Sequence, residues 1–197
     1  MKVIWMGHFM NLYFDMEFTG LRKNTTPISI GIVSDNGKRF YAEFCDYDKS
    51  QCSDWIKENV ISHTIIGGDS NLAKKLEEES NIKVVTGSKS SIRYELSDWL
   101  QQFSDVQFIS DVSHYDFVLL IDIFGDAFDL PDNVSPACYD IHHDIARYYN
   151  ITDSEAFNKS REEIISEIGQ QIDGEKHNAL YDAEVIKGIY DGIFKLK

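Results

Sequence analysis

The chain has 197 residues and a formal net charge of −14, which argues against a basic nucleic-acid-binding protein, because such proteins carry a Lys and Arg footprint. The charge does not exclude an enzyme that meets phosphates through metal ions, since each divalent ion brings two positive charges. Hydrophobic residues make up 43% of the chain, enough for one large domain over residues 1–197 with a real core.

The cysteines point to a reducing compartment. Their odd count and the absence of a Cys-x-x-Cys pair argue against both a disulfide framework and a zinc knuckle. They are Cys45, Cys52 and Cys138. We therefore expect reduced thiols and a cytoplasmic protein.

Neither a signal peptide nor a membrane span is expected. The first ten residues are apolar but lack a long hydrophobic segment and a small-residue cleavage site, and Met6 and Met10 are alternative translation starts to Met1. The most apolar run, 117–124, is interrupted by Asp122 and is far too short to cross a bilayer.

Three strands are expected at the start of the chain. Residues 12–15, 28–33 and 39–44 are apolar or alternating. The Asp-Asn-Gly-Lys sequence at 35–38 predicts a hairpin turn between the second and third strands. The chain therefore opens with a three-stranded meander.

Helices and further strands follow. Apolar spacing and capping residues predict helices over 53–61, 71–80, 90–103, 114–120, 141–149, 153–168 and 177–196. Strands are expected at 106–110 and 137–140, whereas 82–85 is either an edge strand or an extended connection. A strand that enters a helix after a long crossover indicates a parallel arrangement. The expected fold is α/β, with a mixed five-stranded sheet flanked by helices.

Asp15 and Glu17 end the first strand and suggest half of a metal site. Side chains alternate along a strand, so these two carboxylates point to the same side. They repel each other unless a cation lies between them, and Mg²⁺ or Mn²⁺ prefers such oxygen ligands. The alternative is two solvated acids at a sheet edge.

His177 and Asp182 are candidates for a second part of the site. Five residues apart on one helix, they would point roughly 140° away from each other, so they converge only if His177 lies in the preceding loop or first turn. The small Ala179 and Ala183 would allow close packing there. The alternative is a helix-terminal histidine and a helix carboxylate that both face water.

Asp116 is the remaining candidate ligand. It follows the strand at 106–110 and begins an apolar helix, where the helix dipole also favours a carboxylate without any metal. For its polar neighbours we expect a helix cap at Asp111, a surface position for His114 and a polar helix face for Asp122.

These segments together resemble the three motifs of the DEDDh 3′–5′ exonuclease superfamily, which includes proofreading exonucleases, ribonuclease T and oligoribonuclease. The motifs are residues 15–21, then Tyr115-Asp116, then His177 with Ala179 and Asp182. Residues 15–21 are similar to the Asp-x-Glu-x-Thr-Gly-Leu of oligoribonucleases. A histidine five residues before the last aspartate marks the "h" type.

The resemblance is closer to a small group of bacterial exoribonucleases first recognised in mycobacteria. The short length, the insert at 45–90 and the sequence at 115–120 support that subgroup. Asp111-Val112 departs from the superfamily, which usually has His-Asn before the second-motif aspartate.

The resemblance implies a ribonuclease H-like fold and two divalent metal ions, Mg²⁺ or Mn²⁺. Asp15, Glu17 and Asp182 would hold one ion, and Asp15 with Asp116 the other. Two such ions can bind the attacking water and the leaving 3′-oxygen. His177 would be the general base.

The resemblance also implies how a nucleic-acid end is held. Phe18 and Leu21 would stack on or wedge against the terminal bases, and Thr19 would contact the terminal nucleotide. Arg22 and Lys23 either approach phosphate or are solvated loop charges. A homodimer is also implied.

We therefore expect a metal-dependent 3′–5′ exoribonuclease that acts on single-stranded 3′ ends or overhangs. One alternative is a 3′–5′ DNA exonuclease of the proofreading or repair type, since recognition of the 2′-hydroxyl cannot be read from the sequence. Others are a non-catalytic binding module of the same fold and an acidic or calcium-binding interaction protein. No EF-hand loop supports the last of these.

Overall fold

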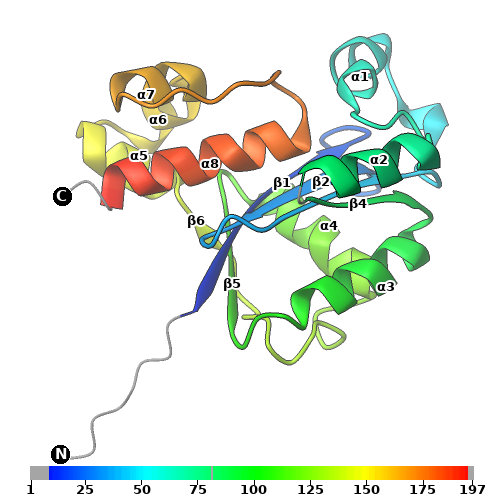
Figure 1. Cartoon of the computed structure of the whole chain (residues 1–197). Helices are drawn as coiled ribbons and strands as arrows, with labels where there is room; N and C mark the ends of the chain where they lie inside the picture. The colour runs from blue at the N-terminus through cyan, green and yellow to red at the C-terminus, as the bar shows by residue number, and fades with distance from the viewer. Residues whose placement is uncertain (1–8, 81, 195–197) are drawn as a thin grey trace, which may run out of the picture.

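The computed structural model describes residues 9–80 and 82–194, and in this part of the chain six strands form one mixed sheet (Figure 1). The strand order is β4-β3-β2-β1-β5-β6. The strands are β1 (Met10–Phe18), β2 (Pro27–Ser34), β3 (Arg39–Phe44), β4 (Ile82–Gly87), β5 (Val106–Ser110) and β6 (Tyr139–Asp140).

The expected meander is confirmed, but the expected count of five strands is wrong. β1, β2 and β3 pair antiparallel, while β5 runs parallel to β1. The sixth strand is β4, the segment for which the sequence left two possibilities. It pairs parallel to β3 at the sheet edge, where Val84 is buried against the core.

Helices cover both faces of the sheet. In Figure 1, α3 and α4 lie against one face and α8, with α5 to α7, against the other. The helices are α1 (Asp54–Asn59), α2 (Ser70–Ser80), α3 (Lys89–Leu100), α4 (His114–Phe124), α5 (His142–Tyr149), α6 (Asp153–Asn158), α7 (Arg161–Glu167) and α8 (Ala179–Phe194), with short 3₁₀ helices η1 (Lys49–Gln51) and η2 (Ile61–His63).

The alternation of β1 divides its side chains between these two layers. Leu12, Phe14 and Met16 pack into the α3–α4 layer, and Tyr13 packs against α8. Because side chains alternate along a strand, Asp15 and Glu17 lie on the α8 face. The strand thus directs both carboxylates toward the helix that carries Asp182.

The structure differs from the predicted helices most clearly in two places. The expected helix at 153–168 is two helices, because Lys159 has an extended backbone and the Ser160 side chain caps α7. The last helix begins at Ala179, not at 177. Residues 1–8 of the N-terminal segment and the expected end of the last helix at 196 lie outside the described residues.

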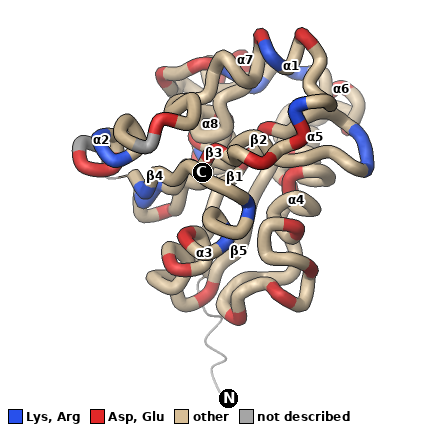
Figure 2. Tube along the Cα trace, turned by 90° about the vertical axis from the view of Figure 1, so that its right-hand side faces the viewer, with Lys and Arg blue, Asp and Glu red and all other residues tan. Residues whose placement is uncertain are grey.

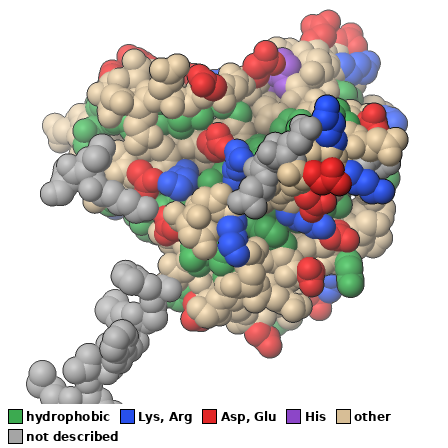
Figure 3. Space-filling view, in the orientation of Figure 1, with side chains coloured by type: hydrophobic (Ala, Val, Ile, Leu, Met, Phe, Trp, Pro, Cys, Tyr) green, Lys and Arg blue, Asp and Glu red, His purple; other side chains and the backbone are tan. Residues whose placement is uncertain are grey.

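Charges of both signs are spread over the surface. Figure 2 shows Asp and Glu on most elements, and on the face drawn in Figure 3 basic side chains lie among acidic ones. Within the described residues, no helix is both long and apolar enough to cross a bilayer.

Candidate active site

A pocket of about 260 Å³ lies where the end of β1 meets the N-terminal ends of α4 and α8. The five residues predicted as metal ligands or general base all line it: Asp15, Glu17, Asp116, His177 and Asp182. The fold therefore brings together groups as far apart in the sequence as Asp15 and Asp182.

His177 occupies the loop before α8, as its convergence with Asp182 requires. Its φ of 64° is left-handed, and its backbone N–H donates to Asp182 Oδ2 at 2.9 Å. Asn178 then starts the helix, because its Oδ1 accepts from the backbone N–H groups of Leu180 and Tyr181, both at 3.2 Å.

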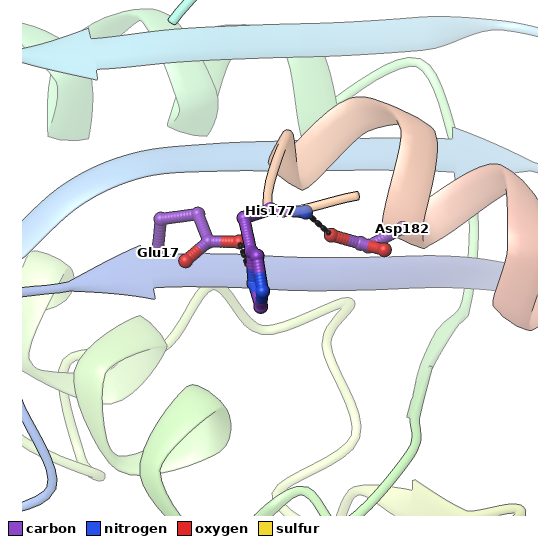
Figure 4. A group of neighbouring side chains, drawn as sticks. All are labelled: Glu17, His177 and Asp182. Atoms are coloured by element: carbon purple, nitrogen blue, oxygen red, sulfur yellow. Dashed lines mark hydrogen bonds and ion pairs between the residues drawn. The ribbon is translucent and has the colours of Figure 1, made fainter. Parts of the chain in front are cut away.

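Glu17, His177 and Asp182 form the tightest cluster of possible ligands among the described residues (Figure 4). One ligand atom from each lies within 4.8 Å of the others. His177 Nδ1 is 3.8 Å from Glu17 Oε1. The three groups come from a strand, a loop and a helix, so their convergence depends on the whole fold.

Asp116 completes the carboxylate set from the other layer of the structure. It lies in the first turn of α4, is only 7% exposed, and accepts a hydrogen bond of 3.1 Å from the backbone N–H of Met16. This bond places the Asp116 carboxylate beside β1, next to the residue that separates Asp15 from Glu17.

Burial makes the charged form of these carboxyl groups unfavourable. Burial, and then repulsion by Asp116 and Asp182, raises the pKa of Asp15 well above its ordinary value. Burial is also the main cause that raises the pKa of Glu17 to about 8 and those of Asp116 and Asp182 to about 7. Burial lowers the pKa of His177, which favours its neutral form.

This donor set fits divalent cations. Four carboxyl groups with raised pKa values surround one pocket, and a bound cation would favour their ionised forms. Carboxylate oxygens are the ligands that Mg²⁺ and Mn²⁺ prefer.

The residues expected to hold a nucleic-acid end differ in their exposure. Phe18 stacks on Tyr115, with ring centroids 5.5 Å apart and planes at 26°, and Leu21 is 78% exposed. Thr19 is fully buried, and its hydroxyl donates to Gln51 Oε1 at 2.6 Å. A contact through the Thr19 hydroxyl would require that bond to be given up.

Three features of the pocket were not identified from the sequence. Trp55 of α1 packs its ring against that of His177, with centroids 5.2 Å apart, and Lys176 lines the pocket. Asp111 is not the expected cap: Arg161 binds both of its carboxylate oxygens. Asp111 and Arg161 are 50 positions apart, so only the folded structure shows that they pair.

The expectations for two other polar residues are confirmed. His114 is exposed at the start of α4, and Asp122 pairs with Lys89 across to α3 at 2.8 Å on the exposed side.

Comparisons with known proteins show which family the chain resembles over most of its length. The family model described as the 3′–5′ exoribonuclease Rv2179c-like domain matches residues 10–194. The 3′–5′ exoribonuclease Rv2179c of Mycobacterium tuberculosis is 24% identical over 127 residues, which cover 64% of this chain and 67% of that protein.

Solved structures show the same fold at low sequence identity. The nuclease domain of 3′hExo, a DEDDh family member bound to rAMP, has a TM-score of 0.64 and 14% identity, covering 97% of this chain and 93% of that chain. S. pombe Pop2p, in a form with Mg²⁺ and Mn²⁺ bound, has a TM-score of 0.53 and 17% identity, covering 91% and 81%. The expected ribonuclease H-like α/β fold is confirmed.

Because the family model matches nearly the whole described chain, this protein belongs to the Rv2179c-like family of 3′–5′ exoribonuclease domains.

Proposed function

We propose that this chain, as one catalytic domain, releases nucleotides from the 3′ ends of single-stranded RNA or of single-stranded overhangs, in a hydrolysis that depends on two divalent ions, Mg²⁺ or Mn²⁺. The observation that carries the proposal is the convergence of four carboxyl groups, one buried and three partly buried, and His177 in one pocket. The family to which the chain belongs supports the same activity.

Four residues are proposed as metal ligands. Asp15, Glu17 and Asp182 would hold one ion, and Asp15 with Asp116 the other. Bound ions would supply positive charge that makes water more acidic and stabilises the leaving oxygen. The Met16 N–H and the His177 N–H each hold one of these carboxylates in place.

His177 is proposed as the general base. Its burial favours the neutral imidazole that can take a proton from the attacking water. The ring of Trp55 packs edge-to-face against the imidazole. Phe18, stacked on Tyr115, and the exposed Leu21 provide apolar surface for the terminal bases.

The charge of the chain favours short, single-stranded ends as substrates. A net charge of −14 repels long nucleic acid and weakens non-specific binding. The main alternative substrate is a DNA 3′ end, and the assay below separates the two.

The experiment compares nucleotide release from one short RNA labelled at either end, and from the matching DNA, in Mg²⁺, Mn²⁺ and EDTA. We expect immediate release of labelled mononucleotide from the 3′-labelled RNA, a ladder of shortened products from the 5′-labelled RNA, and no activity in EDTA. Equal activity in EDTA, or faster cleavage of the DNA, would contradict the proposal.

Two further properties are proposed from the resemblance and the sequence. The first is a homodimer, which light scattering on the purified chain tests directly. The second is a cytoplasmic location, supported by three cysteines that are all free thiols.

A further inference from the structure

The backbone at His177 needs support from its surroundings. Its φ of 64° is a left-handed conformation, which is sterically unfavourable for a residue with a side chain. Such a conformation persists only where neighbouring contacts determine it. The contact from Asp182 accounts for the N–H of His177, but it does not account for the residues on either side.

One residue of the insert, His63 at the end of η2, contacts both neighbours of His177. Its ring Nδ1 lies 2.9 Å from the backbone oxygen of Lys176. Its own backbone oxygen accepts from Asn178 Nδ2 at 2.7 Å. Because a carbonyl oxygen only accepts hydrogen bonds, the first contact places a proton on His63 Nδ1.

The segments next to His63 are themselves fixed by hydrogen bonds. The segment after it is anchored by Glu43 of β3, a carboxylate that is 5% exposed and accepts from the backbone N–H groups of Ile66 at 2.7 Å and Gly68 at 3.1 Å. On the other side, Asn178 caps α8. Figure 1 shows α1, next to η2 in the chain, near the end of α8 where these contacts form.

We propose that His63 is a positioning residue for the general base: its side-chain and main-chain hydrogen bonds, one on each side of His177, fix the loop that aims the imidazole into the pocket. This inference rests on the proposed role of His177. The insert at 45–90, which lies outside the three motifs, would then contribute to the reaction by positioning His177.

The two ring nitrogens of His63 allow a matched pair of variants. Nδ1 contacts the backbone of the His177 loop, whereas Nε2 lies 3.7 Å from the exposed side chain of Glu175. The amide nitrogen of Asn can replace Nδ1 as a donor, and that of Gln corresponds instead to Nε2. His63→Asn should therefore preserve the loop, and His63→Gln should not.

The experiment is a double-mutant cycle on a short 3′-labelled RNA in Mn²⁺, with kcat and KM measured for the wild type, H63A, H177A and H63A/H177A. We expect H63A to lower kcat by about tenfold or more with KM nearly unchanged, because small misplacements of a catalytic group are costly. In the H177A background, H63A should cause no further loss, because His63 acts through His177. H63N should recover most of kcat and H63Q should not.

Three results would overturn the inference: wild-type kcat in H63A, an equal loss from H63A in both backgrounds, or equal behaviour of H63N and H63Q. H143A, a change at an exposed histidine of α5, serves as the control for histidine removal. If H63A does not fold, the comparison of H63N with H63Q decides alone. Equal kcat in the wild type and in H177A would refute the proposed base itself, and this result is read without any change at His63.

Discussion

Asp15 of β1 and Gly31 of β2 face each other across the antiparallel pair, and the missing side chain of Gly31 lets α8 rest directly on the sheet beside Asp15. A Cβ at Gly31 would lie 2.3 Å from the backbone nitrogen of Leu180 and 2.4 Å from the carbonyl carbon of Ala179. The first turn of α8 also carries Asp182. The distance between two of the proposed ligand elements is thus set by a glycine outside the three motifs.

We expect Gly31→Ala to displace the start of α8. The added methyl group meets backbone, which no side-chain rotation can relieve, and overpacking of this kind costs about 1–3 kcal/mol. Urea denaturation should show that loss, and calorimetry should show weaker Mn²⁺ binding. Gly87→Ala is the control, because its Cβ comes no closer than 3.2 Å to the side chain of Ser91. Unchanged Mn²⁺ affinity in Gly31→Ala would contradict the close-approach explanation.

The stability of the metal-free protein should fall as the pH rises from 5 to 8. Glu17, with a pKa of about 8, and Asp116 and Asp182, each about 7, hold protons in the folded state. An unfolded chain releases those protons above about pH 4. Unfolding therefore releases protons in this window, and a higher pH favours the unfolded state.

Thermal melts in EDTA at pH 5, 6, 7 and 8 test this dependence. Added Mn²⁺ should raise Tm most at pH 8, where the ligands are ionised. Asp116→Asn should flatten the dependence in EDTA, because it removes one of the buried acids. A metal-free Tm that increases across the same range would show that these carboxyl groups do not hold protons in the folded state.

Gln51→Ala should weaken substrate binding. The Gln51 side chain accepts from the Thr19 hydroxyl at 2.6 Å and donates to the Asn24 backbone oxygen at 3.0 Å, so it fixes the loop that carries Leu21. Loss of neutral hydrogen bonds costs about 1 kcal/mol each, and we expect KM for a short RNA to rise about threefold to tenfold with kcat nearly unchanged.

Ser50→Ala is the matched control for that change. Ser50 belongs to the same 3₁₀ helix, but its side chain bonds only to Asp48 among the described residues. If Gln51→Ala and Ser50→Ala have the same KM, the loop does not depend on Gln51.

The part of the site that follows local rules could be predicted from the sequence. Alternation along a strand put Asp15 and Glu17 on one face, and helix geometry required His177 to precede the helix of Asp182. The early meander followed from apolar runs and one strong turn sequence.

What the sequence did not predict depends on contacts between distant segments. The pair of Asp111 with Arg161, the packing of Trp55 on His177 and the bonds of His63 join residues 50 or more positions apart. β4 is a strand because β3 lies beside it, and its short, mixed sequence does not decide this alone. No periodicity within a segment encodes such partners.

In the proposed function, the carboxylates at the end of β1 drive metal-dependent release of nucleotides from RNA 3′ ends. The direct measurement is the rate of mononucleotide release from 3′-labelled RNA in saturating Mn²⁺ by Asp15→Asn, with Asp132→Asn, a change at an exposed carboxylate, as the control. We expect Asp15→Asn to lose activity by roughly a thousandfold or more, on the order of what removal of a group that stabilises transition-state charge costs, while Asp132→Asn matches the wild type. Activity of Asp15→Asn close to that of Asp132→Asn would contradict this role of the β1 carboxylates.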